Sequence, residues 1–140
     1  MGSRSGVDGT LDVSIVSAAP YSYGATPITA SSGIVAASSS TQTLPGVAGK
    51  TTYMTGFEIT GAGATAASVI SVSVFLQGAA QTLYYALVIP AGVTTSITPL
   101  IVEFPIPVSS GAANSVIQVI MPSFGTGNTA ACLTVHGFQL

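Results

Sequence analysis

Short β-branched segments separated by turn residues limit the fold of this chain more than any other feature. From about residue 33 they recur at spacings of roughly 10 to 15 residues, which is typical of antiparallel sandwiches. The predicted strands are Gly33–Ser38, Lys50–Thr60, Ser68–Gln77, Thr82–Ile89, Leu100–Phe104, Val116–Met121 and Thr129–Phe138, with a further one near Val13. No long stretch between the turns carries a helical apolar stripe. We therefore expect an all-β, antiparallel two-sheet sandwich with almost no helix.

The 140 residues suit one domain preceded by an arm. Residues 1–30 are rich in Gly, Ser, Ala and Pro and carry only isolated apolar side chains. We interpret residues 1–30 as an extended N-terminal arm and residues 31–140 as a single β-sandwich domain. At about 3.3 Å per residue the arm reaches up to about 100 Å, enough to lie across a neighbouring molecule. A frayed terminus is the alternative.

Several predicted strands are apolar on both faces. In Thr82–Ile89 the two alternating sets are Leu83, Tyr85, Leu87 and Ile89 on one face, and Tyr84, Ala86 and Val88 on the other. A sandwich buries one face of each sheet, so we expect a subunit interface or the arm to cover the second. Central strands that tolerate a few exposed aliphatic residues are the alternative. The predicted interface residues are Val13, Ile15, Tyr21, Tyr23, Ile28, Tyr84, Val88 and Ile101.

Charge is scarce, and this favours assembly. Only 4% of the residues are charged, against about a quarter in ordinary soluble domains, and a freely soluble monomer needs surface charge to remain in solution. Two basic residues do not neutralise a row of phosphates, so we expect no nucleic-acid partner. The longest apolar run, residues 83–89, is far shorter than the roughly 20 residues of a membrane-spanning helix. We therefore expect no membrane partner.

The sequence contains few groups that could do chemistry. Cys132 and His136 lie four residues apart on one predicted strand, about 13 Å from each other, which is too far for the hydrogen bond that activates a thiol. No Cys/His spacing suits a tetrahedral metal site. We therefore expect no catalytic, cofactor-binding or metal-binding residues, no cofactor and no enzymatic activity. A catalytic carboxylate pair of Glu58 and Glu103 is the alternative.

Four segments, in a chain so poor in charge and so rich in Ala, Ser, Thr, Gly and Val, carry a family resemblance. They are Tyr53–Thr65, Ala86–Thr94, Phe104–Val108 and Pro122–Thr129. Over roughly residues 50–140 the chain resembles the small capsid cement or decoration proteins of tailed bacteriophages. The resemblance implies a jelly-roll subunit that sits on the capsid exterior in many copies. It also implies synthesis in the host cytoplasm and two partners, namely the major capsid protein and further copies of the chain in a dimer or trimer.

We therefore expect a structural virion protein that binds the outer surface of a phage capsid and cements neighbouring capsid subunits. The alternative is a phage tail or fibre module that binds a receptor or carbohydrate. Such a module needs a polar or aromatic recognition patch, and the chain has no Trp. A small outer-membrane barrel is a further alternative, opposed by an N-terminus without the apolar core of a signal peptide.

Overall fold

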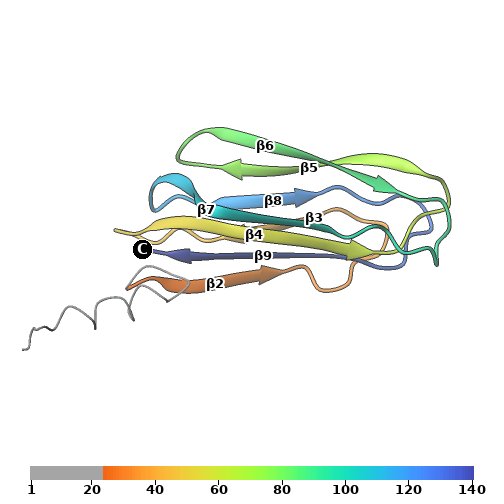
Figure 1. The fold of residues 1–140 in the computed structure, drawn as a ribbon, viewed down its shortest axis with the longest axis horizontal. Helices are drawn as coiled ribbons and strands as arrows, with labels where there is room; N and C mark the ends of the chain where they lie inside the picture. The colour runs from red at the N-terminus through yellow and green to blue at the C-terminus, as the bar shows by residue number, and fades with distance from the viewer. Residues whose placement is uncertain (1–23) are drawn as a thin grey trace, which may run out of the picture.

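The predicted all-β sandwich is confirmed. The computed structural model describes residues 24–140, which form eight strands in two four-stranded antiparallel sheets (Figure 1). The strands are β2 (Thr26–Ser31), β3 (Ser40–Leu44), β4 (Thr51–Gly61), β5 (Ser68–Leu76), β6 (Gln81–Ile89), β7 (Leu100–Ala113), β8 (Ile117–Met121) and β9 (Ala131–Gln139). The strand orders are β2-β9-β4-β7 and β3-β8-β5-β6. The described part of the chain has no helix suited in length and hydropathy to cross a membrane.

Five of the predicted strands are confirmed as β4, β5, β6, β8 and β9, and the differences lie mainly before residue 50. The predicted strand Gly33–Ser38 is wrong: it makes only an isolated bridge at Val35, and Ala37 has a positive φ of 46° that ends an extended run. The arm boundary at residue 30 is also too late, because β2 pairs with β9 from Thr26. The predictions for Val13, Ile15, Tyr21 and Tyr23 lie outside the described residues.

The predicted end of a strand at Phe104 is wrong as well, because β7 continues through two prolines. Met54 pairs with Val108 and Gly56 pairs with Glu103, so a short step along β4 corresponds to a long bulge along β7. Proline lacks the N–H of a ladder hydrogen bond. An edge strand tolerates it where that position faces solvent, and β7 is the last strand of its sheet.

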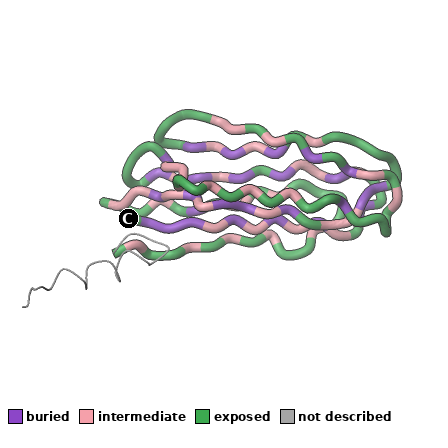
Figure 2. The backbone as a smooth tube through the Cα atoms, in the orientation of Figure 1, coloured by how far each residue is buried: buried purple, intermediate pink, exposed green. Residues whose placement is uncertain are grey.

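The core lies between the two sheets and follows the period of two along the strands (Figure 2). Its fully buried side chains include Leu44, Met54, Phe57, Ile59, Val72, Val74, Ile89, Ile117, Val119, Met121, Leu133 and Val135. Phe57 on β4 meets Tyr85 on β6 edge to face, with ring centroids 5.4 Å apart, and so joins the two sheets. Burial raises the pKa of the Tyr85 phenol above its ordinary value.

One buried side chain ties the loops together at one end of the sandwich. Asn128 is 3% exposed, and the two N–H groups of its Nδ2 are shared among the carbonyls of Ala62 at 2.9 Å, Gly63 at 3.2 Å and Ala130 at 3.2 Å. Its Oδ1 accepts a hydrogen bond from the N–H of Ala37 at 3.3 Å. A single amide thus links the β2–β3, β4–β5 and β8–β9 connections.

Candidate functional site

The outer face of the sheet β3-β8-β5-β6 is an uncharged surface with exposed apolar side chains. No residue of these four strands is charged. Val69, Tyr84 and Val88 are 67%, 70% and 65% exposed, and Ile120 is 37% exposed. Val69 pairs with Val88, and Ser73 pairs with both Tyr84 and Ile120. The four apolar side chains therefore lie on one side of the sheet, with Ser71, Ser73 and Ala86 between them, and we call this side the apolar face.

The four predicted interface residues that the structure describes fall in three places. Tyr84 and Val88 lie together on the apolar face, as the apolar pattern on both sides of their strand indicates. Ile101 is 62% exposed but belongs to β7 in the other sheet. Ile28 on β2 is half-buried and packs against the core. The fold thus brings together two of these residues and separates the other two from them.

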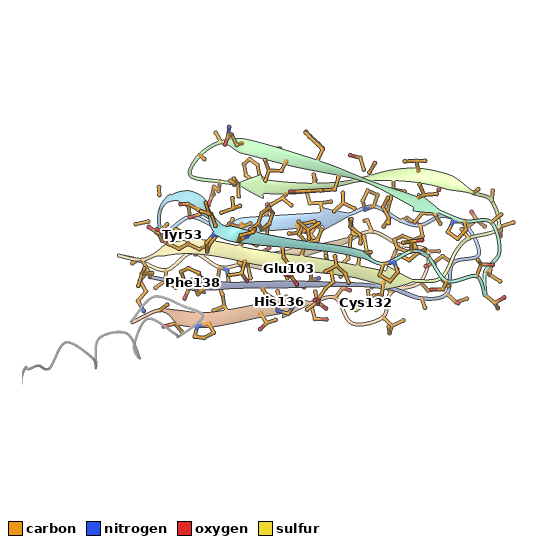
Figure 3. The ribbon with its side chains drawn as sticks, in the orientation of Figure 1. Tyr53, Glu103, Cys132, His136 and Phe138 are labelled. Atoms are coloured by element: carbon orange, nitrogen blue, oxygen red, sulfur yellow. The ribbon has the colours of Figure 1, made fainter. Side chains whose placement is uncertain are left out.

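The outer side of the sheet β2-β9-β4-β7 carries a hollow of about 530 Å³ lined by both charged and apolar side chains. We call it the polar hollow after its charged residues. It is lined by Glu58 of β4, Glu103 of β7 and His136 of β9, among others; Figure 3 labels Glu103 and His136 on their strands. Gly56 pairs with Glu103 on one side and with His136 on the other, which aligns the three strands here. A side chain at Gly56 would collide with the backbone of Val102, so glycine allows β7 to approach this closely.

His136 and Glu58 form a hydrogen-bonded pair in the hollow. The His136 Nε2 and Glu58 Oε1 atoms are 2.9 Å apart, and the two side chains are 42% and 43% exposed. At that exposure a pair stabilises the fold by at most about 1 kcal/mol. Sequence reasoning missed this pair, because its members are 78 residues apart and only the β4–β9 register brings them together. His136 thus contacts Glu58, and Cys132 lies further along β9 (Figure 3).

The hollow offers hydrogen-bonding groups. Its carboxylates accept hydrogen bonds, and the imidazole of His136 donates or accepts according to its protonation. Among residues 24–140 no cluster of three His, Cys, Asp or Glu side chains is arranged to hold a metal ion. Glu58 and Glu103, considered above as a catalytic pair, line the same hollow, and Glu58 is bound to His136. The hollow therefore combines hydrogen-bonding groups with apolar side chains such as Ile101 and Phe104.

Comparisons of the chain with protein-family models, with curated proteins and with solved structures found no match. The functional argument therefore depends on the two surfaces described above. The apolar face is suited to contact with another protein surface, whereas the polar hollow is suited to a polar ligand. They lie on different sheets.

Proposed function

We propose that this chain is a structural virion protein that binds the outer surface of a phage capsid and cements neighbouring capsid subunits. The observation that carries the proposal is the apolar face, with its four exposed apolar side chains and no charge on any of its strands. Contiguous exposed apolar patches mark interaction sites, because solvating them is unfavourable. An exposed, uncharged sheet face suits a protein partner of matching shape, and the partner we propose is the major capsid protein.

We also infer that the sandwich is a jelly roll. The strand pairs support this inference because they are nested: β2 with β9, β3 with β8, β4 with β7 and β5 with β6. Such nesting is what a long antiparallel hairpin gives when it rolls into two sheets, and the jelly roll recurs in viral capsid domains. The likeness is one of architecture, and architecture alone does not assign a function.

The mechanism of cementing is mechanical. Each copy contributes modest apolar contacts, and repetition over a shell multiplies them, because once one contact forms the next becomes effectively intramolecular. The N-terminal arm strengthens the attachment by pairing along an exposed strand edge of a neighbour. Alternate side chains of the arm, Val13 and Ile15, contact the neighbour's surface and provide specificity. Both contributions are proposals about the assembled particle.

Co-sedimentation of the purified chain with emptied phage shells tests the proposal. We expect wild type to sediment with the shells, and Val69→Lys to bind at least about tenfold more weakly, because it places a charge on the apolar face. Val69 lies on an inner strand of its sheet, and its high exposure makes this substitution tolerable for folding. Ile101→Lys is the matched control, similarly exposed but on the other sheet. Equal binding by Val69→Lys and wild type would contradict a shell-binding role of the apolar face.

A receptor- or carbohydrate-binding module is the second candidate, and the polar hollow favours it. The fold assembles there the polar patch that the sequence does not reveal, with Glu58, Glu103 and His136 around one opening. We expect a glycan screen to find a ligand whose binding is lost in Glu103→Gln and retained in Val69→Lys. A screen in which wild type and Glu103→Gln give the same pattern removes this candidate.

A further inference from the structure

The two sheets leave four edge strands, and three of them carry features that oppose pairing with another chain. The edges are β2 and β7 in one sheet and β3 and β6 in the other. Natural sheets protect edges with short strands, prolines, charges or bulges. β2 has six residues and Pro27, and β3 has only five residues. β7 combines Glu103, Pro105 and Pro107 with a bulge.

The fourth edge, β6, has none of these features. It is nine residues long, from Gln81 to Ile89, and contains no charge and no proline. Its register with β5 runs without interruption from Ser68 to Leu76. Within the described part of the chain, no backbone hydrogen bond joins β6 to any segment other than β5. A long, regular, uncharged edge of this kind is a template for an added strand.

The surface around β6 is complementary in shape to the same surface of a second copy of the chain. Tyr84 projects from the strand and is 70% exposed. A hollow of about 380 Å³ lies between the end of β6 and the segment leading into β7, lined by Ala86, Val88 and Leu100 among others. A large exposed side chain and a hollow therefore occur on one strand, a short distance apart. In a two-fold symmetric contact the same patch serves both copies, so a projection and a hollow on one strand fit each other twice.

We infer that β6 pairs antiparallel with β6 of a second copy of this chain, about a two-fold axis near Tyr85. Full overlap of the two strands puts each Tyr84 opposite the other copy's Ala86, on the same side of the joined sheet. The large ring then lies over the small side chain, next to the hollow. The two four-stranded sheets become one continuous sheet across the dimer.

The charge distribution favours a second copy over a charged partner. Neither β6 nor any other strand of its sheet carries a charge, so two copies meet here without like-charge repulsion. Pairing also buries no unpaired ion, which would be costly. The charged residues of the described region, Lys50, Glu58 and Glu103, lie in the other sheet or directly before it. The inference goes beyond the proposed function, because the dimer forms in solution without a shell.

Sedimentation equilibrium of the full-length chain tests the inference. We expect wild type to form a species of twice the chain mass of 13.8 kDa. The double variant Tyr84→Lys/Val88→Lys should raise the dimer Kd by roughly 100-fold or more, since it removes two apolar side chains and adds two charges per copy at the contact. Val69→Lys is the matched control: it is similarly exposed and lies on the same face, but on β5 inside the sheet. It should leave the dimer intact.

Hydrogen exchange is a second measurement. It distinguishes pairing of the β6 strands from a dimer contact made only through the apolar face, which would not protect the backbone amides of β6. Backbone amides of residues 81–89 that point away from β5 should exchange more slowly at concentrations where wild type is dimeric. The inference is overturned by a wild type that stays monomeric, by a dimer that Tyr84→Lys/Val88→Lys does not weaken, or by a dimer without this added protection. A dimer lost in full-length Val13→Lys/Ile15→Lys but retained in Tyr84→Lys/Val88→Lys also overturns it, because the N-terminal segment would then be the occupant.

Discussion

Replacing Asn128 with alanine should destabilise the sandwich more than any other single polar change in its loops. The Asn128 side chain is buried and hydrogen-bonds to backbone groups of three connections. Alanine fits the space but has no donor or acceptor to replace the amide. The connections would then keep their turns but lose the group that holds them together.

The size of the destabilisation depends on how many backbone groups lose the hydrogen bond that Asn128 makes to them. The carbonyl of Ala130 still accepts the N–H of Ala62 at 2.9 Å, so it is not left unpaired. The carbonyls of Ala62 and Gly63 and the N–H of Ala37 each lose a partner, and a lost hydrogen bond costs about 0.5 to 1.5 kcal/mol net, with more for a buried group left unsatisfied. We expect a loss of about 3 kcal/mol in the free energy of unfolding. For a chain of this size that lowers the Tm by about 10 °C.

Urea and thermal unfolding, followed by circular dichroism, measure this loss. Thr129→Ala is the control, because it shortens the exposed neighbouring side chain and should change stability by less than about 0.5 kcal/mol. Asn128→Asp tests the direction of the hydrogen bonds: a carboxylate facing three carbonyls should destabilise at least as much as alanine. If Asn128→Asp is as stable as wild type, the amide is not the donor described here and the reasoning fails.

Two further predictions concern the sheets. Gly137→Ala should lower the free energy of unfolding by about 3 kcal/mol or more, since its Cβ would collide with the Tyr53 carbonyl and lie 2.8 Å from Leu44 Cδ1. The control Gly24→Ala has open space but a φ of 86°, and should lower it by only about 1 kcal/mol. Equal losses of the two variants in urea unfolding would refute the steric argument. Burial raises the pKa of Tyr85 above 10.0, so its contribution to stability is complete below that pH and is lost as pH rises through the higher folded-state pKa. The free energy of unfolding, measured across this alkaline range, should therefore fall less in Tyr85→Phe than in wild type. If Tyr84→Phe, at the exposed neighbouring position, reduced the fall by the same amount, the assignment of this pH dependence to Tyr85 would be wrong.

The sequence was sufficient for strands with a strong apolar pattern between turn residues and insufficient where local composition misleads. Serine alternates with apolar side chains in the middle of β5, and β6 is a nearly unbroken apolar run, so the bounds of both strands were predicted closely. β3 reads Ser-Thr-Gln-Thr-Leu, and only Leu44 is fully buried, so it gives no such pattern. The predicted strand Leu100–Phe104 stopped before the two prolines of β7, because the sequence does not reveal that this strand lies at an edge where proline is tolerated.

The candidate surfaces were predictable to a lesser degree. Tyr84 and Val88 could be identified because their strand is apolar on both faces, and a sandwich covers only one. The same argument selected Ile101, but alternation along a strand does not tell which sheet the strand joins. The pair of Glu58 and His136 depends on the β4–β9 register, which includes an irregularity between Met54 and Gly56. That register is a tertiary property with no local signature.

The placement of the few charges carries more information than their scarcity. Sheet neighbours such as β4, β7 and β9 are distant in sequence. The linear chain therefore gives no sign that Glu58, Glu103 and His136 gather on one sheet and leave the strands of the other uncharged. If the uncharged face lies against a shell, the opposite sheet faces solvent, and the hollow with Glu103 remains open to a ligand. Cementing and recognition then use different faces and do not compete. For that reason Val69→Lys should weaken only shell binding, and Glu103→Gln should weaken only ligand recognition. A single variant that abolished both activities would show that the two faces do not act independently.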